Sequence, residues 1–121
     1  MATSGLSPDP KAYRERLANQ PDEQIDAWAS ELMRDIAIRR GVLKVVADFR
    51  RAAGLDELQF ERVFASGGGP PAVIGRDAQG RLMVPAIALH ALVPGVRAQL
   101  RDGRARLIDY LVLNFNELVY V

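Results

Sequence analysis

The chain has 121 residues, of which 49% are hydrophobic and 26% are charged, a composition typical of one soluble globular domain. It contains no cysteine and a single histidine. This excludes disulfides, thiol catalysis and cysteine-based metal sites, and it argues against a His-rich metal site. Sixteen basic residues stand against 15 acidic ones, so the chain as a whole lacks the strongly basic balance of many nucleic-acid-binding proteins.

No apolar run in the sequence approaches the roughly 20 residues that cross a bilayer. The first residues also lack the basic and then apolar pattern of a secretory signal. We therefore expect a cytoplasmic location and no membrane contact. Residues 1–7 are small and polar and are predicted to form a disordered tail, and residues 8–121 are predicted to form a single globular domain.

The first half of the chain predicts helices. A short helix is predicted from about Pro8 or Pro10 to Asn19, and Asp9 can cap it with Pro10 at the first helical position. Apolar residues then recur at three- and four-residue spacing from Ile25 to Ile36, and the helical pattern continues through residues 42–53 to a predicted cap at Gly54. Gly41 leaves two alternatives open, one long helix of about 30 residues or a pair of helices.

In the middle of the chain, the spacing of apolar residues changes from a helical pattern to a strand pattern. Asp56 is the predicted N-cap of a further short helix, which ends at the glycine and proline run over residues 66–71. Residues 72–75 and 81–84 predict the strands of a β-hairpin around a polar connection. A short apolar helix is expected after Pro85 and is expected to stop at Pro94 and Gly95, and residues 96–101 are expected to form a polar helix or turn.

The last segment is apolar from Leu107 to Leu118, mostly at helical spacing. Alternation from Leu111 to Val121 leaves a terminal strand as the competing interpretation. We favour a helix to about Glu117 and an extended tail over residues 118–121. The complete pattern predicts a helix-dominated α+β fold, with a long helix or helix pair, a short helix, one β-hairpin and a C-terminal helix.

The sequence carries no recognisable catalytic pattern. The glycine run at residues 66–69 is followed by prolines rather than by the Lys and Ser/Thr of a phosphate-binding loop. His90 lies in an apolar stretch without a local partner, and none of the serines stands in a Gly-x-Ser-x-Gly elbow. We therefore expect no catalytic residue, no cofactor and no bound metal.

Charge is distributed unevenly along the chain. Residues 1–38 carry a net charge of −3, residues 39–54 a net charge of +4, and residues 97–106 a net charge of +3. The basic segments fit a surface for an acidic partner or a phosphate backbone. A solvated helix face with intrahelical pairs is the alternative, and charge spacing by itself favours it. The candidate interaction surface consists of Arg39, Arg40, Lys44, Arg50, Arg51, Arg97, Arg101, Arg104 and Arg106.

The order of helix 42–53, turn, helix 56–65 and hairpin 72–85 resembles a winged-helix layout, in which the second helix enters the major groove. The resemblance is one of element order and includes no specific motif. In that arrangement Gln59, Glu61 and Arg62 would face DNA, with Arg76 and Arg81 on the wing. The second helix carries a net charge of −2, which opposes contact with phosphates.

We therefore predict a small non-enzymatic protein–protein interaction or adaptor domain, and self-association is one form of this prediction. Acidic and basic segments on the same chain would orient such an association. The alternative is a winged-helix-like DNA-binding or regulatory protein that uses the basic residues of 39–51 and the wing arginines. An enzyme or small-ligand binder that uses His90 is the third and least favoured hypothesis.

Overall fold

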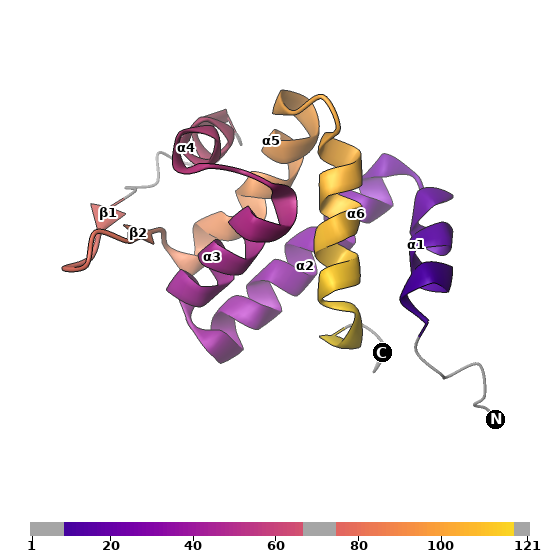
Figure 1. Ribbon diagram of the computed structural model, residues 1–121, viewed down its shortest axis with the longest axis horizontal. Coiled ribbons are helices and arrows are strands. Elements are labelled where there is room, and N and C mark those ends of the chain that lie inside the picture. Colours follow the sequence, from indigo (N-terminus) through magenta and orange to yellow (C-terminus); the bar gives the residue numbers. More distant parts are fainter. Residues whose placement is uncertain (1–8, 67–74, 118–121) are drawn as a thin grey trace.

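The computed structural model describes residues 9–66 and 75–117. The predicted tails at 1–7 and 118–121, and residues 72–74 of the predicted first strand, lie outside the described residues. Six α-helices, two short 3-10 helices and one hairpin make up the described part, which confirms the helix-dominated α+β fold. Figure 1 shows α1 at one end of the long axis and the hairpin at the other.

The first two helices follow their sequence signals closely. Helix α1 spans Pro10–Ala18, and the Asp9 carboxylate accepts a hydrogen bond from the Lys11 N–H at 3.1 Å. Helix α2 spans Asp22–Arg40 and buries the apolar face that its spacing predicts. Gly41 then breaks the helical run, because its φ of 87° and ψ of 149° lie in a region that is essentially restricted to glycine. The helix pair is therefore the correct alternative.

Helix α3 (Val42–Ala53) ends and helix α4 (Glu57–Ser66) begins at the residues predicted to cap them. Gly54 ends α3 in the left-handed conformation, with φ of 68° and ψ of 30°. Asp56 accepts a hydrogen bond from the Gln59 N–H at 2.7 Å, and the Gln59 side chain accepts one from the Asp56 N–H at 3.1 Å. This reciprocal pair is a capping box, which starts α4 one residue after Asp56.

The hairpin is shorter than predicted among the described residues. Strand β1 is Gly75–Arg76 and strand β2 is Leu82–Met83, paired antiparallel with Gly75 opposite Met83. The turn is closed by Asp77, whose carboxylate accepts hydrogen bonds from the Gln79 and Arg81 N–H groups, each at 2.9 Å. Arg76 was predicted in the connection, but it pairs with Leu82 and so belongs to the ladder.

The prediction that Pro94 and Gly95 stop a helix is wrong. The 3-10 helix η2 (Ala86–Ala91) leads into α5 (Leu92–Gln99), so residues 96–99 belong to the same helix. Pro94 is the third residue of α5, where a backbone N–H has no intrahelical acceptor to lose. Gly95 is needed for packing, because a Cβ there would lie 2.6 Å from the Val63 carbonyl oxygen of α4.

Helix α6 (Gly103–Leu113) and the 3-10 helix η3 (Phe115–Glu117) complete the chain as described. The strand alternative is therefore wrong for residues 107–117. The buried Phe49 of α3 meets the buried Tyr110 of α6 edge-on, with ring centroids 5.1 Å apart. Helix α2 packs against α3, α6 and η2, so one apolar core holds the helices together and leaves the charged faces outside.

Candidate functional site

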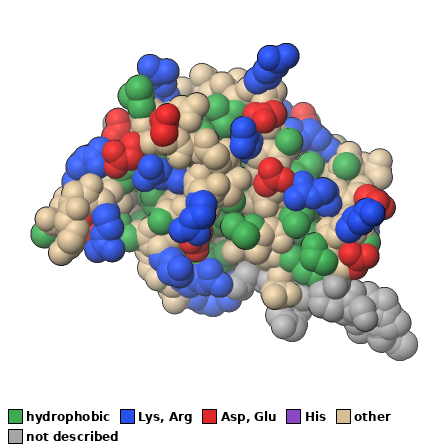
Figure 2. All heavy atoms as spheres, in the orientation of Figure 1, with side chains coloured by type: hydrophobic (Ala, Val, Ile, Leu, Met, Phe, Trp, Pro, Cys, Tyr) green, Lys and Arg blue, Asp and Glu red, His purple; other side chains and the backbone are tan. Residues whose placement is uncertain are grey.

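The structure separates the nine candidate basic residues into groups with different surroundings. Three of them, at the end of α2 and along α3, surround one carboxylate. Asp48 lies 3.6 Å from the Arg40 guanidinium, 3.8 Å from the Lys44 ammonium and 3.3 Å from the Arg51 guanidinium. We call Arg40, Lys44 and Arg51, together with Asp48, the basic corner. Figure 2 shows basic side chains gathered along the lower edge of the molecule, where α2 ends and α3 begins.

The basic corner presents positive charge outward. The Asp48 side chain is only 14% exposed, whereas those of Lys44 and Arg51 are 63% and 71% exposed. One covered carboxylate between the exposed Lys44 and Arg51 leaves positive charge on this surface. Arg39 lies beside Arg40 at the exposed end of α2. The corner can therefore attract carboxylates or phosphates, which are the anions that guanidinium groups recognise best.

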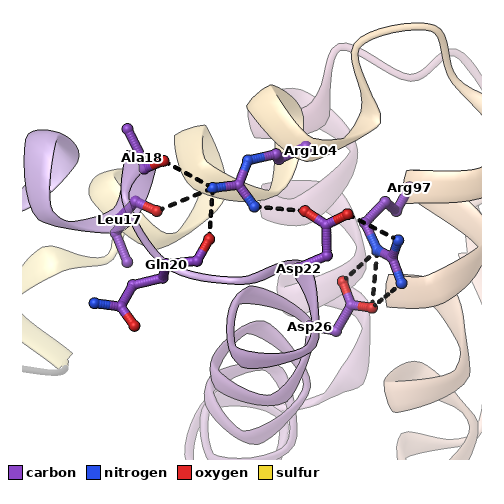
Figure 3. A network of polar contacts seen from close by, with 7 residues as sticks. All are labelled: Leu17, Ala18, Gln20, Asp22, Asp26, Arg97 and Arg104. Carbon is purple, nitrogen blue, oxygen red and sulfur yellow. Dashed lines mark hydrogen bonds and ion pairs between the residues drawn. The ribbon is translucent and has the colours of Figure 1, made fainter.

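Arg97 and Arg104 lie elsewhere, in a network with the acidic start of α2 (Figure 3). The Arg97 Nε donates to both Asp26 oxygens at 3.0 Å, and its Nη1 reaches Asp22 at 3.2 Å. The hydrogen bond with Asp26 raises the pKa of Arg97. The Arg104 Nη1 donates to the other Asp22 oxygen at 2.5 Å. Both arginines are therefore neutralised by carboxylates of the same chain.

Arg104 also completes the end of α1. Its Nη2 donates to the backbone carbonyls of Leu17 at 3.3 Å, Ala18 at 3.0 Å and Gln20 at 2.7 Å. The last carbonyls of a helix have no partner within the helix. The Arg104 guanidinium, from a residue distant in the sequence, therefore caps the C-terminal end of α1. Asp22 and Arg104 are far apart in the chain, which is why charge spacing in the sequence does not reveal the contact.

The two remaining candidates in the second basic segment, Arg101 and Arg106, take no part in this network. Arg106 pairs with Asp102 one helical turn away, at 3.2 Å. Arg101 is exposed in the turn before α6, and no described residue bonds to it. The two basic segments therefore do not merge into one patch formed by all nine residues.

Arg50 faces the hairpin rather than the basic corner. Its Cζ lies 6.0 Å from the centroid of the buried Phe60 ring, a cation–π contact. Among the described residues, the Arg50 Nε is a buried side-chain donor without a hydrogen-bond partner. Arg50 also borders a hollow of about 180 Å³ between α3, the start of α4 and the hairpin.

Three of the five residues that a winged helix would place against DNA, Glu61, Arg76 and Arg81, form ion pairs within the chain. Arg76 of the hairpin bonds to Glu57 of α4 at 2.7 and 3.3 Å and lies 3.5 Å from Glu61. Arg81 bonds to Asp77 at 2.8 Å. The hydrogen bond from Arg76 lowers the pKa of Glu57, and the backbone N–H of Arg81 is the main cause of a lowered pKa at Asp77. The wing arginines thus fix the hairpin to α4 and close its turn.

His90 borders a second, open hollow of about 300 Å³ along α2, which is also lined by Ser30, Glu31 and Arg34. The Ser30 hydroxyl donates to the main-chain carbonyl of His90 at 3.4 Å, not to its ring. The pair therefore lacks the hydroxyl-to-imidazole hydrogen bond that activates a serine nucleophile. Within residues 9–66 and 75–117, no three His, Asp or Glu side chains gather as metal ligands.

Comparison of the chain with models of protein families gives no match, and neither does comparison with curated proteins or with solved structures. Across the described helices, none has the length and apolar character needed to span a bilayer. The assignment of function therefore rests on the arrangement of side chains described above.

Proposed function

We propose that this chain is a small non-enzymatic interaction domain that binds an acidic segment of another protein through the basic corner. The observation that supports it is the gathering of Arg40, Lys44 and Arg51 around the covered Asp48. The pairs of Lys44 and Arg51 with Asp48 lie within one helix and are worth little to stability. An anionic partner would neutralise the positive charge that the single carboxylate leaves on the exposed Lys44 and Arg51.

Acidic protein partners are favoured over a second copy of this chain. The acidic start of α2 was expected to pair with basic segments of another copy, but Asp22 and Asp26 already pair with Arg97 and Arg104 of their own chain. Two of the carboxylates that a second copy would offer to the basic corner are therefore already neutralised. Electrostatic complementarity of this kind steers association and orients the partner.

The winged-helix-like nucleic-acid-binding protein remains the second candidate, because the basic corner would attract phosphates as well. The second helix of that layout argues against it. Helix α4 carries Glu57 and Glu61 on its surface, and the exposed Leu58 lies between them. Carboxylates on a helix in the major groove would oppose the phosphates on both sides.

Fluorescence anisotropy with a labelled octaglutamate peptide tests the proposal. The test variant carries Lys44→Glu and Arg51→Glu, both at exposed positions of the basic corner. The matched control carries Arg62→Glu and Arg101→Glu, which change the net charge equally at exposed residues outside the corner. We expect salt-sensitive binding that weakens about tenfold or more in the test variant and changes little in the control.

The same titration with a mixed-sequence DNA duplex separates the two candidates. Tighter binding of the duplex than of the peptide at equal salt, lost in the Lys44 and Arg51 variant, would favour the nucleic-acid alternative. Absence of peptide binding at low salt would overturn the proposed function, since screening is weakest there. Equal losses in the test and control variants would also overturn it, because net charge alone would then explain the binding.

A further inference from the structure

The hollow beside Arg50 and the basic corner share one helix. Leu43, Val46, Ala47 and Arg50 of α3 line the hollow. Their spacing of three and four residues places them on one stripe of the helix surface. Lys44, Asp48 and Arg51 have the same spacing one position further along, so they form the neighbouring stripe. An apolar stripe and a cationic stripe therefore run side by side along the outer face of α3.

The far wall of the hollow comes from the hairpin. Leu82 of β2 supplies apolar surface there, and Arg81 and Glu57 stand at the edge. Pairing of Arg76 with Glu57 holds the hairpin against α4, at 2.7 Å, so this wall is kept in place. The hollow is thus a built depression between three elements and not a gap at a loose loop.

The size of the hollow limits what it can receive. Pockets for cofactors and drug-sized ligands occupy roughly 300–1,000 Å³ and enclose their ligand. The hollow measures about 180 Å³, which suits a single aliphatic side chain. The floor formed by Leu43, Val46, Ala47 and Leu82 is apolar, and an aliphatic side chain gains from leaving water there.

Arg50 adds an unmet donor beside this apolar floor. Its Nε is buried without an acceptor among the described residues, an arrangement that is unfavourable until an acceptor is supplied. Arg81, which bonds to Asp77 at 2.8 Å, stands on the opposite side, and the Glu57 carboxylate also lines the hollow. The Arg50 side, beside the cationic stripe of α3, is therefore where a carboxylate that flanks an aliphatic side chain would meet positive charge.

From this juxtaposition we propose that the hollow receives one aliphatic side chain, such as leucine, of the acidic partner segment, with its flanking carboxylates on Arg50 and the basic corner. This inference rests on the proposed function and defines the partner further, as a linear acidic segment with an aliphatic anchor. Such anchors give specificity, while the charges around them give orientation and rate.

Two labelled glutamate peptides test the inference on the unmodified protein. They are identical except for the central residue, which is leucine in one and serine in the other. Because burying an aliphatic side chain is favourable, we expect the leucine peptide to bind about tenfold more tightly, or by about 1.4 kcal/mol. The preference should persist at moderate salt, since burial of apolar surface is not screened.

Filling the hollow tests where the leucine binds. Ala47 is exposed and lines the hollow, so Ala47→Phe should remove the preference for leucine over serine. Ala12→Phe is the matched control, at an exposed position of α1, at the opposite end of the molecule (Figure 1). Far-ultraviolet circular dichroism confirms that both variants are folded.

The outcomes separate the two proposals. If both peptides bind equally and both depend on Lys44 and Arg51, the hollow is not an anchor site and only this inference is overturned. If neither peptide binds at low salt, the proposed function is overturned together with the inference. A leucine preference that survives Ala47→Phe would place the anchor elsewhere and would also overturn the inference.

Discussion

Gly95 lies where α5 touches α4, and the backbone of α4 leaves no room for a side chain. A Cβ at this position would lie 2.6 Å from the Val63 carbonyl oxygen and 3.1 Å from the Val63 Cγ1. Gly95→Ala should therefore lower the free energy of unfolding by about 1–3 kcal/mol, despite the better helix propensity of alanine. Urea denaturation measures the effect. Gly75→Ala is the control, because a Cβ at Gly75 has nothing within 4 Å, and an equal loss in both variants would contradict the packing argument.

The basic corner contains more cations than its single carboxylate can neutralise. Asp48→Asn removes that carboxylate from beside three positive groups and should destabilise the fold by about 1 kcal/mol. Lys44→Gln relieves repulsion and should leave stability within about 0.5 kcal/mol of the original. Thermal unfolding of both variants measures this asymmetry. A loss on Lys44→Gln as large as that on Asp48→Asn would mean that the cations serve stability and not binding.

At the scale of single residues, the sequence predicts the groups that act locally. The caps at Asp9, Asp56 and Gly54 were all predicted, because the partner of each lies within a few residues along the chain. The contacts of Asp22, by contrast, cannot be predicted from the sequence. Its bonds to Arg97 and Arg104 depend on how α5 and α6 pack, and no spacing in the sequence contains that information.

At the scale of elements, the hairpin depends on ionised carboxylates. The pKa of Glu57 is lowered mainly by its hydrogen bond with Arg76, and that of Asp77 mainly by the Arg81 N–H. A lowered pKa in the folded state means that stability is fully present above the ordinary carboxyl pKa and is lost as the pH falls through the folded value. Acid should therefore loosen the attachment of the hairpin to α4 before it unfolds the helical core.

Glu57→Gln tests this order of events. The variant keeps the shape of the side chain and loses the ionisable group, so its melting temperature should fall less than that of the original protein between neutral and acid pH. Thermal unfolding across this pH range measures the difference, and an NMR titration of Glu57 locates it. Identical pH profiles for the two proteins would show that the pair with Arg76 does not contribute to acid sensitivity.

Two elements show why helix boundaries differ in how well they can be predicted. A glycine inside a helix costs only about 1 kcal/mol, which packing easily offsets, so the sequence does not decide between the two alternatives at Gly41. Helix α2 packs against α3, and Gly41 between them takes backbone angles that are essentially restricted to glycine. Pro94 predicts a stop because proline disrupts a helix interior, but its effect depends on where the helix begins. The start of α5 at Leu92 is set by tertiary packing.

At the scale of the whole molecule, internal neutralisation of the acidic segment bears on self-association. Asp22 and Asp26 at the start of α2 are paired with Arg97 and Arg104, so this part of the acidic segment has little charge to offer to another copy. We expect sedimentation velocity to give the same single species at low and moderate salt. A complex that dissociates as salt rises would instead support self-association through the charged segments.

The network around Asp22 joins elements that no single stretch of sequence connects. Arg104 of α6 bonds to Asp22 of α2 and to the carbonyls that end α1. A double-mutant cycle with Asp22→Asn and Arg104→Met should therefore give a coupling energy of about 1 kcal/mol, because the two groups belong to one network. Arg104→Met alone should cost more than Asp22→Asn, because it also leaves the carbonyls of α1 without their donor.

The pair of Arg14 and Asp109 is the matched control for this cycle. It also links α1 to α6, at 2.6 Å, but its side chains are 49% and 41% exposed and share no further described partner. Its coupling should be at most about 0.5 kcal/mol, since an isolated surface pair is screened by water and salt. Similar coupling energies in the two cycles would show that proximity of charge, and not the network, holds α1 to the rest of the molecule. A larger coupling at Asp22 would explain how a short N-terminal helix with one buried residue, Leu17, stays attached to the core.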